Sequence, residues 1–224
     1  MDFRNAKELL KVCQEQNLSI SAVMLQRELT EGEQDPEETD RKMDRVLEIM
    51  KSAASTPIHT PVKSMGGLIG GEAKKISDHK DAGKGLCGDL LERAVIYAMA
   101  TLETNASMGV IVASPTAGSA GIVPGLLLAL LETYELSDEQ IKQGLYNASA
   151  IGYLAMRNAT VAGAVGGCQA EVGIASAMAA SATVELMGRI PGTIPCRSIH
   201  CSYEYARSGL RSGRRSGRIS LPEP

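Results

Sequence analysis

Apolar residues in the first 187 positions recur with the spacing of an α-helix, and no segment alternates as a β-strand does. Helical patterns run from Asp89 to Thr104 and from Ala170 to Met187. Aromatic residues make up only 3% of the chain, so a core must be built from Ala, Leu, Ile, Val and Met, which let helices pack closely. The sequence therefore predicts a mainly α fold, with residues 1–187 forming a single helical domain that carries glycine-rich loops.

The starts and ends of several helices are marked by their own residues. Asp35 followed by Pro36 predicts a helix start, and Ser137 with Gln140 predicts a capping box. The segment Thr56–Pro61 holds two prolines and is expected to break the helix before it. The predicted helices cover residues 2–16, 19–31, 35–55, 89–104, 122–133, 137–147, 148–158 and 170–187.

The chain changes character at Gly188. Residues 188–224 contain seven Arg, no Lys and two Glu, a balance of +5, whereas the first 187 residues carry 16 basic and 24 acidic side chains, a balance of −8. Arg-Ser-Gly recurs at Arg207, Arg211 and Arg215, and no helix or strand period is present. A low-complexity segment of this kind buries too little apolar surface to fold, so a disordered tail is predicted.

Cysteine usage and the N-terminal residues bear on the compartment. Five cysteines are an odd number without a compact disulfide framework, and the segment Met1–Glu8 is polar, unlike a signal peptide. These features favour a reducing cytoplasm. The longest apolar run, Gly121–Leu131, is too short to cross a bilayer, so no membrane partner is expected.

Three loops consist almost wholly of small residues: 64–71, 105–109 and 114–121. Such loops between helices leave backbone N–H groups and hydroxyls free, and helix N-termini favour anions. They predict a pocket for a small carboxylate, with ordinary tight turns as the alternative. The first loop is neither a phosphate-binding nor a dinucleotide-binding loop, because no Gly-Lys-Ser/Thr follows it and no strand precedes it.

Cys168 lies directly after the small-residue turn Gly163–Gly167 and directly before a predicted helix. Three interpretations stay open: a buried small apolar residue, a nucleophile activated by the helix N-terminus, or a ligand of a metal or an iron–sulfur cluster. A nucleophile would need His59, His79 or His200 as its base, and no local pattern selects one of them. The chain has no Cys-x-x-Cys spacing that would decide in favour of a metal.

Four strings, taken in order, resemble the α chain of the bacterial iron–sulfur-dependent L-serine dehydratases. They are Ser64–Gly71, Asn105–Gly109, Ala113–Pro124 and Gly166–Gly173, and the likeness spans roughly residues 1–188. The most specific parts read Pro-Thr-Ala-Gly-Ser and Gly-Gly-Cys-Gln-Ala-Glu-Val-Gly. The resemblance implies an all-helical catalytic domain, a [4Fe-4S] cluster, and deamination of L-serine to pyruvate and ammonia.

The resemblance also implies roles for individual residues and a partner. In such enzymes three cysteines hold the cluster, and the open iron acts as a Lewis acid on the substrate hydroxyl. Cys168 matches the first cluster ligand, and a separate β chain completes the enzyme; no nucleic acid is expected as partner. The matching loop residues are Ser64, Asn105, Ser107, Thr116 and Ser119 as catalytic candidates, and Gly66, Gly67, Gly70, Gly71 and Gly118 as substrate-binding candidates.

The tail departs from the family pattern. The family continues with Cys-Asp-Pro-Val-Ala-Gly-Leu-Val-Glu-x-Pro-Cys, which holds the other two ligands, and this chain has Arg207–Pro222 in its place. Codons can be chosen for these residues so that reading one base later spells Cys-Asp-Pro-Val-Ala-Gly-Leu-Val-Glu-Tyr-Pro-Cys. The two cysteine codons would straddle Leu210/Arg211 and Leu221/Pro222. Codons for Arg189–Ser198 can likewise be chosen so that an offset reading spells Ala-Tyr-Pro-Glu-Gln-Ser-Leu-Ala-Ala.

These observations lead to the hypothesis of a frameshift near Gly188/Arg189. A chain that keeps only Cys168 of the ligand set is expected to be inactive and poorly stable. The alternatives are a non-catalytic helical subunit, and a binding module whose basic tail contacts nucleic acid or an acidic partner weakly and in a salt-sensitive way. The sequence selects no general base, oligomeric state, or preference between serine and threonine.

Overall fold

The computed structural model describes residues 2–32, 35–159, 161 and 167–188. Within these ranges the chain is helical and contains no strand, which confirms the predicted fold class. The predicted tail lies outside the described residues, apart from Gly188. The helices are α1 (Ala6–Gln16), α2 (Ile20–Glu31), α3 (Pro36–His59), α4 (Glu72–His79), α5 (Asp89–Ala106), α6 (Ile122–Thr133), α7 (Asp138–Asn158) and α9 (Cys168–Met187), with a π-helical turn at Lys80–Lys84 and a 3-10 turn at Ala117–Ser119.

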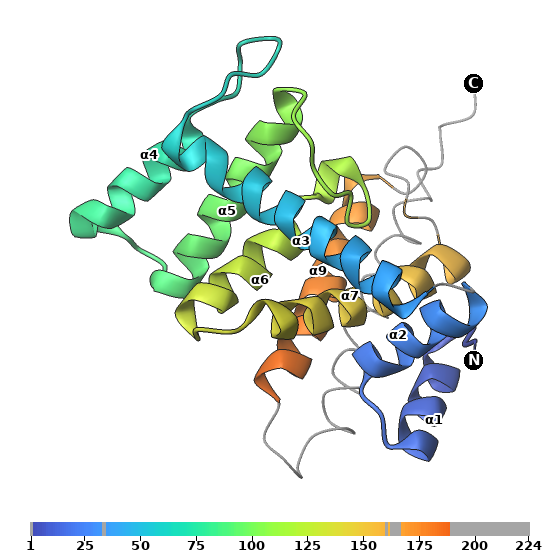
Figure 1. Ribbon diagram of the computed structural model, residues 1–224. Helices are drawn as coiled ribbons and strands as arrows, with labels where there is room; N and C mark the ends of the chain where they lie inside the picture. The colour runs from blue at the N-terminus through green and yellow to red at the C-terminus, as the bar shows by residue number, and fades with distance from the viewer. Residues whose placement is uncertain (1, 33–34, 160, 162–166, 189–224) are drawn as a thin grey trace, which may run out of the picture.

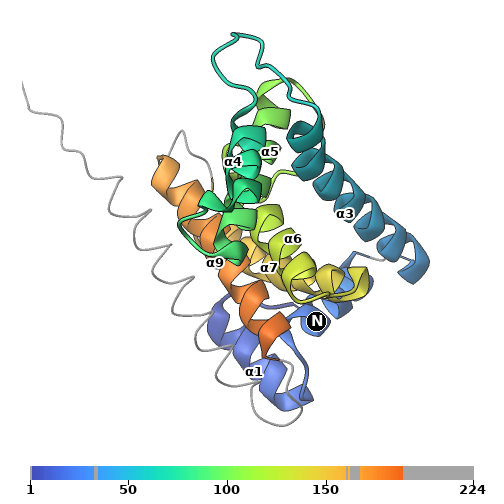
Figure 2. The same cartoon turned by 90° about the vertical axis from the view of Figure 1, so that its left-hand side faces the viewer.

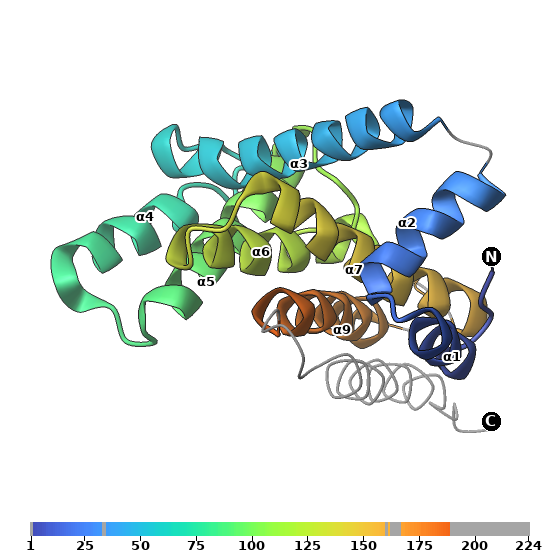
Figure 3. The ribbon, with the colours of Figure 1, turned by 60° about the horizontal axis from the view of Figure 1, so that its bottom comes forward.

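The helices are arranged around α6 and α7. In Figure 3, α3 runs along one side of these two helices and α9 lies on the opposite side. Figure 1 shows α4 at one end of the molecule and α1 with α2 at the other. The most extensive pairings are those of α5 with α6 and of α7 with α9.

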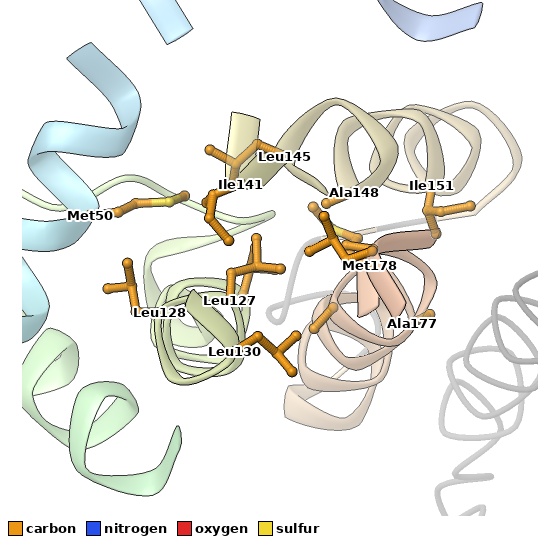
Figure 4. Close-up of a cluster of buried hydrophobic side chains, with 14 of the residues drawn as sticks. Met50, Leu127, Leu128, Leu130, Ile141, Leu145, Ala148, Ile151, Ala177 and Met178 are labelled. Carbon is orange, nitrogen blue, oxygen red and sulfur yellow. The ribbon is translucent and has the colours of Figure 1, made fainter. Parts of the chain in front are cut away.

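The main core lies where α3, α6, α7 and α9 meet. Figure 4 shows Leu127 of α6 pointing toward α7, with Met178 of α9 and Met50 of α3 on either side. Leu127 and Ile141 are each 1% exposed, so water is excluded from this part of the core. A second cluster, centred on Phe3 and Val23, packs α1 and α2 against the far half of α7. As predicted, aliphatic and small residues fill nearly all of both clusters.

Two glycines allow α5 and α6 to pack backbone to backbone. A Cβ at Gly121 would lie 2.5 Å from the carbonyl oxygen of Ala98, and a Cβ at Gly125 would lie 2.8 Å from that of Ala94. Real Cβ atoms do not approach so closely, so no larger residue fits without moving a helix. The loop that precedes α6 is thereby brought close to α5.

Gly125→Ala is expected to destabilise the protein, although alanine is the better helix former by about 1 kcal/mol. The new methyl group meets a backbone carbonyl that cannot rotate away, and overpacking of this kind costs roughly 1–3 kcal/mol. Gly152→Ala in α7 is the matched control, because its methyl group meets only the flexible end of Met178 at 3.2 Å. Urea unfolding should show a lower midpoint for the first variant and an unchanged or higher one for the second. Equal midpoints would contradict the packing argument.

Several predicted helix boundaries were wrong, including the start of the first helix, which lies at Ala6 instead of residue 2. Helix α3 continues through Pro57 to His59 instead of ending at Ser55. Pro57 cannot donate a hydrogen bond to the carbonyl of Ala53, and the hydroxyl of Thr104 in α5 donates to that carbonyl instead, at 2.8 Å. The segments 137–147 and 148–158 were predicted as two helices but form the single helix α7.

Helix α9 also meets the length and composition that a membrane-spanning helix would have, over Ala170–Met187. Half of that window is buried inside the described part of the protein, against α6 and α7. A core helix that is apolar on all sides has the same composition, so this feature by itself does not indicate that α9 spans a membrane.

Candidate functional site

Two of the small-residue loops meet at the C-terminal end of α5. The carbonyl of Ala106 accepts a hydrogen bond from the backbone N–H of Met65, at 3.4 Å. The side-chain amide of Asn105 donates to the carbonyl of Ala117, at 3.2 Å. Figure 2 shows the loop that precedes α4 and the end of α5 at the same end of the molecule. Segments 64–71, 105–109 and 114–121, which are far apart in the sequence, are therefore connected in the structure.

The 114–121 loop is joined in turn to the first turn of α9. The hydroxyl of Thr116 donates to Oε2 of Glu171 at 2.6 Å and lies 3.0 Å from the hydroxyl of Ser119. A Cβ at Gly118 would lie 2.8 Å from Oε1 of Glu171, so glycine lets the loop lie against this carboxylate. The peptide bond between Ser114 and Pro115 in this loop is cis. All four motif segments thus form one connected region.

Cys168 is the first residue of α9, and its side chain is exposed with a free thiol. The interpretation of Cys168 as a buried apolar residue was therefore wrong. Gly167 before it has a φ of 76°, a conformation that other residues rarely adopt. Glu171 follows one helical turn later, so the thiol and the carboxylate that holds Thr116 share the start of one helix. Most of the predicted turn before Cys168 lies outside the described residues.

Ser64 and Ser107, which were predicted to be catalytic, make hydrogen bonds within their own segments. The hydroxyl of Ser64 accepts from the N–H of Ile69 at 3.1 Å and so closes the first loop. The hydroxyl of Ser107 donates to the carbonyl of Thr104 at 3.0 Å and ends α5. Gly66 and Gly67 are exposed, and a Cβ on either would meet no other atom within 4 Å, so nothing in the described residues crowds them.

The other two glycines of the first loop shape its return to α4. Gly70 has a φ of 146°, and a Cβ there would lie 2.0 Å from the carbonyl oxygen of Val62. The N–H of Gly70 donates to the carboxylate of Glu72 at 2.7 Å, and this hydrogen bond lowers the pKa of Glu72. Gly71 has a φ of 90° and is the N-cap of α4. Both positions require glycine for conformational reasons.

Sequence reasoning missed two glutamates that hold these loops. Glu171 lies inside a recognised string but was given no role, and Glu103 was not singled out at all. Glu103 is 1% exposed, and its carboxylate accepts from the N–H groups of Gly71 at 3.1 Å and Ala73 at 2.8 Å. A carboxylate in the last turn of a helix is disfavoured by the helix dipole, and this was the signal that could have identified Glu103.

The described residues do not form a complete site for an iron–sulfur cluster. Such a cluster is held by three or four ligands, mostly thiolates. Across the described ranges no group of three or more His, Cys, Asp or Glu side chains is arranged to hold a metal. Among the described residues, Cys168 is the one thiol at the junction of the loops, since Cys13 is buried in the second core cluster and Cys87 lies before α5. Cys196 and Cys201 lie outside the described residues.

A known protein family matches most of the chain, including all four motif segments. The model of the serine dehydratase alpha chain family matches residues 15–196. A probable L-serine dehydratase alpha chain of Bacillus subtilis (strain 168) is 45% identical over 189 residues, which cover 84% of this chain and 63% of the relative.

The L-serine dehydratase alpha chain of Peptoniphilus asaccharolyticus is 40% identical over 186 residues, which cover 83% of this chain and 64% of the relative. An L-serine dehydratase of Escherichia coli (strain K12) is 30% identical over 227 residues, 99% of this chain and 49% of the relative. The chain thus spans less than two thirds of the length of these relatives. On the family match and these identities, the chain belongs to the serine dehydratase alpha chain family.

Proposed function

We propose that this chain is the helical α part of an L-serine ammonia-lyase, which deaminates L-serine to pyruvate and ammonia. Membership of the family supports this proposal, since the relatives with the same segments are named L-serine dehydratases. The observation that carries it is the link from Thr116 to Glu171, which joins the cis-proline loop to the helix that begins at Cys168.

The arrangement suits a small zwitterionic substrate. Hydroxyl and amide groups of Thr116 and Asn105 lie partly buried near the start of α9, where the helix dipole favours a carboxylate. The exposed glycines of the first loop leave room for a ligand to approach the backbone. In this proposal Glu171 fixes the orientation of Thr116, and Thr116 and Asn105 contact L-serine.

Cys168 is proposed as one thiolate ligand of a [4Fe-4S] cluster in an intact α chain, whose other two ligands would lie in the segment that Arg207–Pro222 replaces here. When bound, such a cluster provides a Lewis acid for the substrate hydroxyl, which otherwise leaves poorly. The exposed thiol at the start of α9, next to the connected loops, supports this role.

The names of the relatives refer to an alpha chain, which supports a separate β chain as partner. We propose a cytoplasmic location on the grounds of the free cysteines, which a reducing compartment preserves. One alternative is a non-catalytic helical subunit, which is favoured by the single thiol that the described part of the chain places at the loop junction. The two functions differ in whether pyruvate is formed.

The test is L-serine binding and turnover by the purified chain with and without a serine dehydratase β chain. A ligand at about 100 times its Kd stabilises the folded state by roughly 2.7 kcal/mol, so L-serine should raise the thermal midpoint. Thr116→Val should abolish that rise, and Thr183→Val, which removes the same hydroxyl from α9 at a remote position, should retain it. A rise without pyruvate, even from a chain in which the codons after Gly188 are read one base later, would favour the non-catalytic subunit. No rise with L-serine would contradict a serine site.

Glu171→Gln is expected to weaken the attachment of the 114–121 loop. The substitution keeps the size of the side chain but replaces a charge-assisted hydrogen bond by a neutral one, a loss of about 1 kcal/mol. A double-mutant cycle with Thr116→Val checks this in urea unfolding. The double variant should lose about 1 kcal/mol less free energy of unfolding than the sum of the losses in the two single variants. Strictly additive losses would show that the two side chains do not interact.

A further inference from the structure

We propose that Glu103 is a positioning residue that holds the glycine-rich loop Ser64–Gly71 in place by capping α4 from another helix. Its importance for L-serine rests on the function proposed above, whereas its hold on the loop does not. Glu103 comes from α5, and the amides that it binds lie about thirty residues earlier in the chain.

The burial of Glu103 shows that its two hydrogen bonds matter. A carboxylate that is 1% exposed has lost nearly all its contact with water, which is costly unless both oxygens are satisfied. Oε2 accepts from Gly71 and Oε1 accepts from Ala73, so each oxygen has one backbone donor. Both donors belong to the start of α4, whose positive dipole end stabilises the negative charge.

The N-cap residue of α4 provides no capping side chain. The first N–H groups of any helix lack partners within it, and a side chain at the N-cap position ordinarily binds one of them. The N-cap of α4 is Gly71, which has no side chain and no side-chain cap hydrogen bond. Glu103 provides the missing acceptor, and this leaves Gly71 free to adopt the positive φ that ends the loop.

The loop has little else to hold it. Met65 is 82% exposed and Leu68 is 90% exposed, so these two side chains contribute almost no packing, and Ile69 is only half-buried. The attachments to the rest of the protein are polar: the hydrogen bond from Met65 to Ala106, and those from Gly71 and Ala73 to Glu103. All of them end in the last turn of α5, and Glu103 is the only side chain of that turn that binds the loop among the described contacts.

Hydrogen exchange of the purified 224-residue chain tests the proposal. In Glu103→Gln the amide nitrogen of the side chain would face a backbone N–H, so at least one hydrogen bond is lost. We expect the amides of residues 64–73 to exchange about tenfold faster, with far-UV circular dichroism and exchange in α6 unchanged. Glu48→Gln is the matched control, because that side chain is 67% exposed on α3. Glu103→Asp keeps the charge on a shorter side chain. Exchange of residues 64–73 should therefore be accelerated less in this variant than in Glu103→Gln.

Unchanged exchange of residues 64–73 in a folded Glu103→Gln variant would overturn the proposal. If that variant does not fold, Glu103→Asp decides in its place: exchange equal to the original protein overturns the proposal, and acceleration confined to residues 64–73 supports it.

A second arm adds L-serine to the same samples. In the original chain L-serine should slow exchange of the loop, and Glu103→Gln should need at least about tenfold more L-serine for the same effect. Faster loop exchange in Glu103→Gln, without any effect of L-serine on the original chain, supports the hold of Glu103 while contradicting the serine site. Equal L-serine dependence in both chains would overturn the positioning role.

Discussion

A gene in which the codons after Gly188 are read one base later is expected to produce a chain that holds an iron–sulfur cluster and, with a β chain, deaminates L-serine. The expectation follows from the segment Cys-Asp-Pro-Val-Ala-Gly-Leu-Val-Glu-Tyr-Pro-Cys, which codons for Arg207–Pro222 can spell when they are read one base later. It would add two thiols to Cys168, which the structure leaves exposed at the start of α9. The resemblance implies three thiolates around a cluster with one open iron, and a single thiolate is too few to hold a cluster.

The measurement begins with the gene itself, read in all frames through codons 186–224. If the gene contains the segment, the chain that is read one base later after Gly188 (the re-registered chain) should be purified without oxygen. It should contain about four iron atoms and show the visible absorbance of a cluster. The 224-residue chain should contain no stoichiometric iron, and Cys168→Ser in the re-registered chain should lose the absorbance. A gene without the segment, or a cluster in the 224-residue chain, would refute the frameshift hypothesis.

Leu127→Ala is expected to lower the free energy of unfolding by about 3 kcal/mol, within the 2–5 kcal/mol typical of such core truncations. Leu127 is 1% exposed and lies in the main core where α6 meets α7 and α9, so its removal leaves a cavity that three helices cannot all close (Figure 4). Denaturant unfolding followed by circular dichroism gives the value.

Leu68→Ala provides the control for that measurement, because it deletes the same atoms from a side chain that is 90% exposed. Its free energy of unfolding should change by less than about 0.5 kcal/mol. Equal losses in the two variants would mean that the main core is not where the structure places it.

Helix α4 (Glu72–His79) was not predicted, because its segment is mostly polar. The other helices could be predicted because their apolar residues follow the helical period, and two boundaries failed where one tertiary contact decides. Pro57 was expected to lie beyond the end of α3, but a hydroxyl from Thr104 satisfies the carbonyl that proline leaves unpaired. Asn147 was expected to end one helix before the next began, but it is fully buried and donates to Glu185 of α9 at 2.6 Å. Neither partner is a sequence neighbour, so no local pattern could reveal them.

The candidate site was predictable as a set of segments but not as a set of contacts. The small residues of the loops indicated where backbone would be accessible, and the structure connects those loops by hydrogen bonds. Their attachments to Glu103 and Glu171 depend on the orientation of two helices that follow at a distance in the chain. For the same reason Ser64, which was predicted to act on substrate, could not be recognised as the residue that closes its own loop.

The last turn of α5 has a consequence for how this family can vary. Glu103, Thr104 and Asn105 are consecutive, yet they reach three different segments: the start of α4, the end of α3, and the loop before α6. Each added residue turns a helix by about 100°, so a single insertion or deletion upstream in α5 would present every one of these side chains to the wrong neighbour. The length of α5 should therefore be under stronger selection than the identity of most of its residues.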